Sequence, residues 1–298
     1  MYPWIDFFYF KIPTFGLMVA TAFLVCHYLL KKDFIKNKYD SIIVDDIIFY
    51  SAISAILGSK IYYIIETSSY NLVFQNIKNI FSAIFTANFS NAILELQNFG
   101  SGLVFNGGFI CAVLFILIYL KKKSLNFFSI ADLVAPYILL GHGIGRIGCF
   151  LVGDDYGVPS NLPWAVSFKQ GMPVSTITTF LNQYSFLNYS ESDLKLYLIN
   201  GSQTFITVHP TQIYEMLLYF IGFYIIKSLY NRYKDNVGFI FSCYLIYGGI
   251  SRFMVEFLRT NERYMFNFSS AQFISIFLIL IGIFISINSL NKNNYGKN

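Results

Sequence analysis

Long runs of apolar residues alternate along the chain with short polar segments. About 20 apolar residues cross the hydrocarbon core of a bilayer as a helix, so each run of this length predicts one transmembrane span. Backbone amides in lipid need partners within the segment, and the spans are therefore expected to be α-helices. Seven runs qualify, at about residues 12–30, 43–65, 102–120, 131–151, 209–228, 237–257 and 268–288. The pattern predicts an all-α membrane protein with seven transmembrane helices.

Two connections are too long to be simple loops. Residues 66–101 mix apolar and polar positions at near-helical spacing, which predicts an arm lying at the membrane interface. Residues 152–208, between spans four and five, contain three prolines and short β-like runs such as WAVSF (164–168). They predict a small head of mixed structure. Residues 1–298 are then expected to form a single integral membrane domain that carries the arm and the inserted head.

Lysine and arginine predict the orientation of the spans. Twelve of these residues lie in short connections and the C-terminal tail on one side, whereas six are spread over the longer segments of the other side. Because short basic loops stay in the cytoplasm, the N-terminus is expected outside and the C-terminus in the cytoplasm. The arm and the head then lie outside.

The composition supports a membrane protein and changes little else. Hydrophobic residues make up 55% of the chain and charged residues 12%, with a mean hydropathy of +0.54. Four widely spaced cysteines show no metal-ligand spacing, so no metal site is expected. No nucleic-acid partner is expected, and the first apolar run is too long for a removable signal peptide.

Ionisable and polar residues of the spans gather near their outer ends, whereas the inner halves hold little beyond Asp45 and Asp46. A charged side chain at bilayer depth costs about 2.5–3.5 kcal/mol even on lenient scales, so these groups are expected to face the interior and find partners. The outer set comprises Lys60, Asn106, His142, Arg146, Asp154, Asp155, His209, Gln212, Glu215, Arg252, Glu256 and Arg259.

The groups that could pair with the arginines of this set indicate what the set binds. Arg252, Glu256 and Arg259 fall on one helical face, so Arg252 and Glu256 can pair with each other. Arg146 has no acid within one turn of its own span and needs Glu256, an outer aspartate or an external anion. Guanidinium groups bind phosphate bidentately, and cations at headgroup depth indicate a lipid phosphate. The alternative is that these charges only hold helices together.

Two glycines precede Arg146 closely and a third follows it. Gly141, Gly145 and Gly148 recur at spacings of four and three, which is typical of closely packed membrane helices.

Five segments together resemble the prolipoprotein diacylglyceryl transferase family, in matching order and spacing over nearly the whole chain. The family signature resembles GRIGCFLVGDDYG, and the other similar segments are IPTFGLM, SGLVFNGG, HPTQIYE and SRFMVEFLR. The resemblance implies transfer of a diacylglyceryl group from phosphatidylglycerol to the lipobox cysteine thiol in a prolipoprotein signal peptide. A thioether forms and glycerol phosphate leaves. It also implies an active site at the outer leaflet of the bacterial cytoplasmic (inner) membrane, no metal or organic cofactor, and no required oligomer.

Residue roles follow from the same resemblance. Arg146 matches the signature arginine and is expected to hold the lipid phosphate, while Arg252 and Glu256 match the late pair that completes the headgroup site. Gly157 matches the closing glycine, and Asp154 stands where the family usually has glutamate. The remaining residues expected to contact substrate are Asn106, Cys149, His209, Gln212 and Arg259.

Departures from the family pattern fall at the thiol-activating end of the site. Cys149 replaces an asparagine, Asn106 a histidine often proposed as the base, and Phe15 a tyrosine. His142 stands one turn before Arg146 and is the preferred base, because imidazole titrates near neutral pH. Glu256 and Asp154 are alternative bases. A further hypothesis is that the Cys149 thiol accepts the diacylglyceryl group transiently.

The chain is therefore expected to be a divergent member of the family. Two other functions stay open: a catalytically altered paralogue that binds lipid or lipoprotein, and a transporter of anionic lipids or solutes. A transporter would place polar residues on both sides of the midplane and often shows inverted repeats, which we do not find.

Overall fold

The computed structural model describes residues 2–7, 10–67, 70–86 and 105–295, which form mainly α-helices. By contacts, the chain divides into two compact units. One comprises Met1–Asp33 with Phe128–Asn298, and the other comprises Phe34–Phe127.

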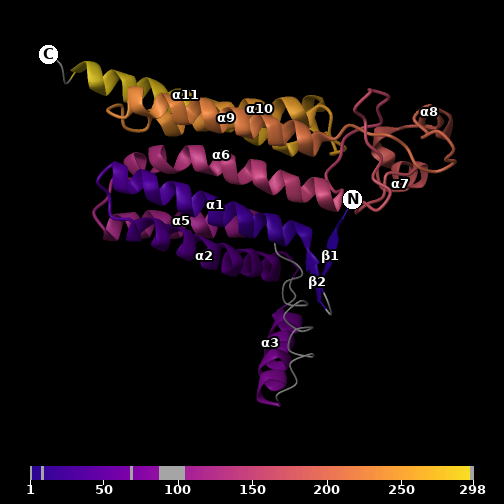
Figure 1. Ribbon diagram of the computed structural model, residues 1–298, viewed down its shortest axis with the longest axis horizontal. Coiled ribbons are helices and arrows are strands. Elements are labelled where there is room, and N and C mark those ends of the chain that lie inside the picture. The colour runs from indigo at the N-terminus through magenta and orange to yellow at the C-terminus, as the bar shows by residue number, and fades with distance from the viewer. Residues whose placement is uncertain (1, 8–9, 68–69, 87–104, 296–298) are drawn as a thin grey trace. The chain divides into compact units, whose positions relative to one another are not determined.

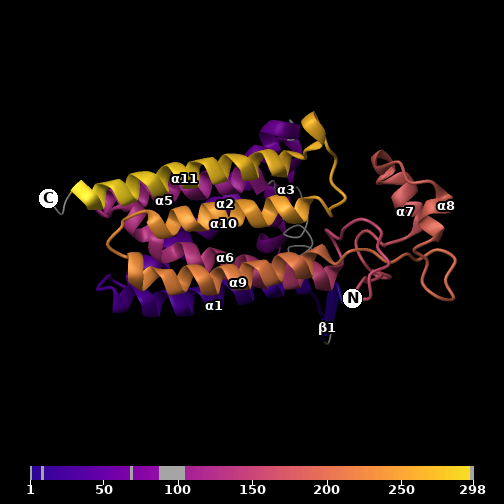
Figure 2. The ribbon, with the colours of Figure 1, turned by 90° about the horizontal axis from the view of Figure 1, so that it is seen from above.

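The first unit contains a hairpin, most of the long helices and the head. Strands β1 (Trp4–Phe7) and β2 (Phe10–Pro13) pair antiparallel, with Ile5 opposite Ile12. The hairpin was not predicted, and it delays the first helix to Thr14. The long helices are α1 (Thr14–Lys36, whose end belongs to the second unit), α6 (Phe127–Val152), α9 (Thr211–Tyr233), α10 (Phe239–Glu256) and α11 (Ser270–Tyr295). Figures 1 and 2 show α9, α10 and α11 side by side.

Residues 153–208 lie beyond one end of these helices, between α6 and α9 (Figures 1 and 2). They contain α7 (Ile177–Asn182), the 3-10 turn η1 (Ser185–Leu187) and α8 (Glu191–Lys195), joined by isolated β-bridges such as Val166 to Val208. A second 3-10 turn, η2 (Met265–Asn267), lies between α10 and α11. Tyr156 and Phe168 stack in an aromatic core that holds the segment together.

The glycines of α6 differ in what they pack against. A Cβ atom at Gly148 would lie 3.2 Å from Phe15 Cα, so glycine lets α1 approach α6 closely. A Cβ atom at Gly141 would lie at an ordinary contact distance of 3.4 Å from Cys26 Sγ, and a Cβ atom at Gly145 would have nothing within 4 Å. The prediction of close helix packing is therefore confirmed at Gly148 and wrong at Gly145.

Charges also lie at the end of the first unit opposite the head, and this corrects the expectation that the inner halves hold few. Lys227 forms an ion pair with Asp33, and its Nζ donates to the Tyr137 hydroxyl at 2.8 Å. Asp132, overlooked in the fourth span, is buried near the same end. Polar residues are therefore less one-sided than the sequence indicated, although the arginines still gather at the head end.

The Asp132 carboxylate caps the first turn of α10. It accepts hydrogen bonds from the backbone N–H of Gly238 at 2.6 Å and of Phe241 at 2.7 Å. The first amides of a helix have no partner within the helix, so a buried carboxylate from α6 supplies the missing acceptor.

We expect Asp132→Ala to lower the free energy of unfolding by about 1–3 kcal/mol, because one buried and one partly buried amide lose their acceptor. Chemical unfolding of the detergent-solubilised protein measures this loss. Asp235→Ala is the matched control, since Asp235 is exposed in the same α9–α10 connection. Equal stability of the two variants would contradict the capping role.

The second unit consists of α2 (Ile42–Thr67), α3 (Tyr70–Phe85), α5 (Phe105–Lys122) and the end of α1. Helices α2 and α5 pack together, and the Tyr119 hydroxyl donates to Asp46 at 2.6 Å. Lys60 is buried in α2, with Nζ 5.1 Å from the Tyr63 ring centroid. Helix α3 falls within the predicted arm, of which residues 68–69 and 87–101 lie outside the described residues. The Asn106 side chain also lies outside them.

Several helices are suited to a membrane. Five of those described are long and apolar enough to cross one: Thr14–Lys36, Ile42–Ile65, Phe127–Val152, Thr211–Tyr233 and Ser270–Asn291. Helices α5 and α10, with 18 residues each, coincide with the other two predicted spans. Large apolar side chains are exposed on the helices, which fits contact with lipid. Examples are Leu24, Leu114, Tyr224, Phe277 and Phe284. The chain is a multi-pass membrane protein.

Candidate functional site

Glu215 lies at the centre of a charged cluster at the head end of the first unit. It sits one turn into α9 and is fully buried. Its carboxylate pairs with the Arg146 Nε of α6, and its Oε1 lies 2.5 Å from the Arg252 Nη1 of α10. Arg259, just beyond α10, places Nη1 3.7 Å from the same oxygen. Guanidinium groups from distant parts of the sequence therefore meet on one carboxylate.

Asp155 forms a second bridge between two of these arginines. Its Oδ2 lies 2.8 Å from Arg146 Nη1 and its Oδ1 2.6 Å from Arg259 Nη2. Burial by itself would raise the pKa of Asp155, but the nearby guanidinium groups of Arg259 and Arg146 outweigh it and lower this pKa to about 2. A carboxyl group whose pKa is lowered in the folded state stabilises the fold at pH values above its pKa in the unfolded chain, about 3.9. This contribution is lost only as the pH falls toward the pKa of the folded state. The bridge therefore persists at neutral pH.

Glu256 completes the set of acids. Its Oε2 lies 3.0 Å from Arg252 Nη2, which confirms the predicted pair. Its Oε1 accepts hydrogen bonds from Asn261 Nδ2 at 2.6 Å and from Ser269 Oγ at 2.7 Å, so it also ties the end of α10 to the start of α11.

A short backbone frame aligns the segments that carry the charges. Gly157 N donates to His209 O at 2.9 Å, His209 N donates to Val158 O at 3.0 Å, and Gly157 forms a β-bridge with Arg259. A Cβ atom at Gly157 would lie 2.3 Å from Leu258 O, so only glycine fits between these segments. Gly157 thus acts on the site through the backbone.

The first residues of α9 fasten the Asp154–Asp155 loop. Thr211 Oγ1 donates to Asp155 O at 2.6 Å, and Gln212 Nε2 donates to Asp154 O. The His209 side chain contacts Tyr214 rather than this loop: its Nδ1 lies 3.2 Å from the Tyr214 hydroxyl. Burial lowers the pKa of His209 and favours its neutral form.

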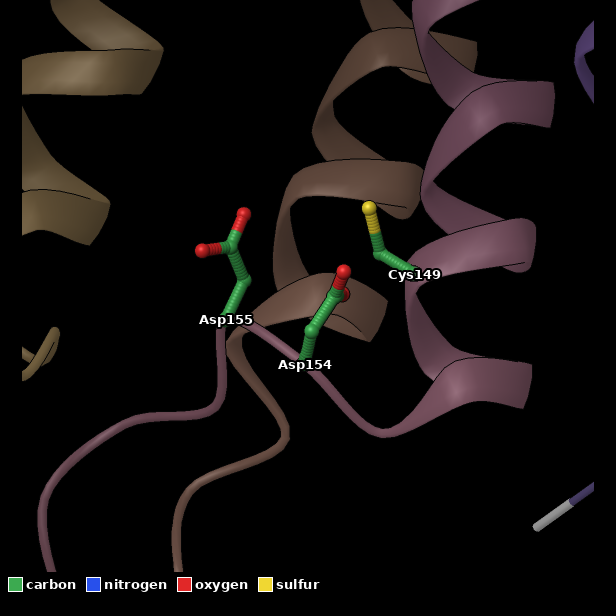
Figure 3. A group of neighbouring side chains, drawn as sticks. All are labelled: Cys149, Asp154 and Asp155. Carbon is green, nitrogen blue, oxygen red and sulfur yellow. The ribbon is translucent and has the colours of Figure 1, made fainter. Parts of the chain in front are cut away.

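Figure 3 shows Cys149, Asp154 and Asp155 directed toward the same space at the end of α6. Their possible ligand atoms lie within 4.8 Å of one another. Burial, followed by the charge of Asp155, raises the pKa of Asp154. Arg146 Nη1 lies 2.8 Å from Asp155 and 3.6 Å from Cys149 Sγ, so a metal ion here would compete with a guanidinium. The donors fit an arginine site better than a metal centre.

The proposed thiol-activating end is less enclosed. His142 lies one turn before Arg146 and is accessible, and its ring packs against Tyr219 with centroids 5.4 Å apart. Phe15, in the first turn of α1, is 44% exposed beside Gly148.

Buried polar atoms of the cluster are left without hydrogen-bond partners among the described residues. They are Arg259 Nε and Nη1, Gln212 Oε1, Glu215 Oε2, Glu256 Oε2 and Asp154 Oδ1. Several of these atoms still have a charge partner, for example Arg259 Nη1 near Glu215. Since an unsatisfied buried donor costs about 1–3 kcal/mol, the Arg259 donors fit a site that receives a polar ligand.

Two acids at the centre of the cluster were not among the predicted site residues. Glu215 was placed at the outer side but given no role. Asp155 was considered only as an outer aspartate that could pair with Arg146, and this pairing is confirmed. The signals were present: Arg146 lacked a partner in its own helix, and Gln212 and Glu215 share a helical face in HPTQIYE.

Comparison with known proteins points to one family. Residues 4–288 match the family model for prolipoprotein diacylglyceryl transferase. A phosphatidylglycerol--prolipoprotein diacylglyceryl transferase of Clostridium tetani is 33% identical over 277 residues, covering 92% of each chain. The proteins of the same name from Finegoldia magna and Fusobacterium nucleatum are 31% and 29% identical, covering 81% and 95% of this chain and 77% and 95% of their own. The similarity extends over nearly the whole chain.

Proposed function

The chain belongs to the prolipoprotein diacylglyceryl transferase family, and we propose that it transfers a diacylglyceryl group from phosphatidylglycerol to the lipobox cysteine of a prolipoprotein. The observation that carries the proposal is the convergence of Arg146, Arg252 and Arg259 at one end of the helices. Guanidinium groups held by buried acids are oriented before the lipid arrives, which is what binding of a phosphodiester requires.

The arginines act on the leaving group. The acceptor sulfur attacks the glyceryl carbon that bears the phosphate, the C–O bond breaks, and its electron pair leaves with glycerol phosphate. Arg146 and Arg252 stabilise the negative charge that develops on that phosphate. Arg259, with buried donors left over, adds a third contact.

The thiol proton must leave as sulfur attacks, because the thiolate is the nucleophile. His142 is our preferred acceptor for this proton. It lies on the same helix as Arg146, one turn away and on the same face. Asp154 and Glu256 are the alternatives, and Glu256 is already engaged by Arg252, Asn261 and Ser269.

Placement in the membrane follows from the basic loops and the site. We propose seven spans with the N-terminus outside, the head and arm on the outer side, and the arginine cluster at the outer leaflet of the bacterial inner membrane. Phosphatidylglycerol then enters from the lipid, and the lipobox peptide comes from a translocated prolipoprotein.

The purified protein tests the proposal directly. It is incubated with phosphatidylglycerol and a lipobox peptide, and the mass of the peptide is measured by mass spectrometry. The cysteine of the peptide is expected to gain the mass of one diacylglyceryl unit. Lipid binding without any mass gain would contradict it and favour the catalytically altered paralogue.

Cys149→Ala is expected to keep transfer within about twofold of wild type. Arg146 is already held by Glu215 and Asp155, so its weak 3.6 Å contact with Cys149 Sγ adds little. The same mass assay measures the rate, with Cys243→Ala as a control at a thiol near the start of α10, nine residues before Arg252. Loss of transfer in a folded Cys149→Ala protein would instead support a covalent intermediate on this thiol.

A further inference from the structure

The three guanidinium groups of the cluster are already matched by carboxylates. Arg146, Arg252 and Arg259 carry three positive charges, and Glu215, Glu256 and Asp155 carry three negative charges in direct contact with them. Asp154 lies beside Asp155 and adds no positive charge. A phosphodiester that entered without any rearrangement would therefore leave an excess negative charge in a poorly hydrated site, which is unfavourable.

Only one of the three acids is placed so that it can leave. Glu215 is fully buried on α9, and Glu256 is 2% exposed and held by Asn261 and Ser269. Asp155, in contrast, has a side chain that is 43% exposed and lies on the loop between α6 and the head. Its backbone adopts the left-handed conformation (φ 57°), two residues after Gly153 (φ 76°).

The Asp155 carboxylate also resembles the expected ligand in shape. Its two oxygens contact different arginines, Oδ2 with Arg146 and Oδ1 with Arg259. The two non-bridging oxygens of a phosphodiester can bind two guanidinium groups in the same way. The carboxylate thus occupies a position where a phosphate group would make the same contacts.

We propose that Asp155 is a built-in competitor of the lipid phosphate: it bridges Arg146 and Arg259 in the empty site and is displaced when phosphatidylglycerol binds. The inference rests on the proposed function. Displacement keeps the cluster neutral, since one negative group replaces another, and it frees the two arginines only when a phosphate is present. Asp155 therefore sets the affinity for the lipid without taking part in bond breaking.

Two substitutions test the competition. Asp155→Asn removes the charge at nearly constant size, and Asp155→Gly removes the side chain at a backbone conformation that glycine adopts without strain. The apparent affinity of a site is proportional to the fraction of molecules in which the site is open. Both variants should therefore bind phosphatidylglycerol more tightly, on the order of tenfold, with a matching fall in KM.

Equilibrium binding of phosphatidylglycerol to the full-length protein in detergent is measured by native mass spectrometry. Diacylglycerol, which lacks the phosphate, is the reference lipid, and its binding should not change. Glu191→Gln is the matched control, because Glu191 is an exposed acid of the head paired only with Lys195 among the contacts described. Tighter binding of phosphatidylglycerol by both variants supports the proposal. Unchanged or weaker binding overturns it and makes Asp155 a clamp that holds the arginines.

The transfer assay separates this inference from the proposed function. A wild-type protein that binds phosphatidylglycerol but fails to modify the lipobox peptide contradicts the function and leaves the binding comparison valid. A wild-type protein that transfers, with Asp155 variants of unchanged affinity, contradicts only the role of Asp155.

Discussion

Alanine at position 146 is expected to abolish diacylglyceryl transfer, lowering the rate by at least about 10³-fold. Arg146 contacts both Glu215 and Asp155, so it stands at the meeting point of the buried carboxylate and the proposed phosphate position. Without it, the leaving phosphate loses a guanidinium that acts most strongly where charge develops. The mass-spectrometric assay with phosphatidylglycerol and a lipobox peptide measures the rate.

Two control variants show whether the effect is specific to the guanidinium group of Arg146. Arg146→Lys keeps the charge but loses the planar fork, so an intermediate rate is expected. Arg232→Ala removes an exposed arginine from the last turn of α9 and should leave transfer unchanged. A folded Arg146→Ala protein that works at the normal rate would show that this arginine does not serve the leaving phosphate.

Removal of the central acid is expected to have the largest effect on stability. Glu215→Ala leaves Arg146 and Arg252 without their shared partner in a buried position, and breaking a buried ion pair from one side costs about 3–5 kcal/mol. Unfolding of the detergent-solubilised protein measures this loss. Transfer should also fall, because the two guanidinium groups are no longer held together.

Glu215→Gln separates charge from shape. It keeps the size and polar atoms but removes the charge, so it should retain more stability than alanine and still transfer slowly. Glu191→Ala serves as the exposed control, for which unchanged stability is expected. Unfolding of Glu215→Ala under the same conditions as wild type would contradict the central position of this carboxylate.

The sequence predicted the meeting of Arg146 and Arg252, and the reason is energetic. Charges in membrane helices are too costly to face lipid, so arginines of different spans had to turn inward and find acids. The Arg252–Glu256 pair followed from a spacing of four on one helix. Close packing at Gly148 followed from the spacing of small residues, although the same spacing was misleading at Gly145.

Other features depend on contacts that no local pattern encodes. Arg259 lies beyond the end of α10 and reaches Asp155 through the bridge between its own segment and Gly157. Asp132 lies in an apolar run, and its role as a cap is visible only once α10 starts beside it. The N-terminal hairpin carries no strong alternation, so the first helix was expected to begin too early.

The most direct test of the account is the position of the lipid phosphate in the protein itself. A density map of the protein in nanodiscs containing phosphatidylglycerol should place the phosphate at hydrogen-bond distance, about 2.7–2.9 Å, from the guanidinium group of Arg146 and from that of a second arginine of the cluster, Arg252 or Arg259. A phosphate bound out of reach of Arg146, with Asp155 still bridging Arg146 and Arg259, would contradict it.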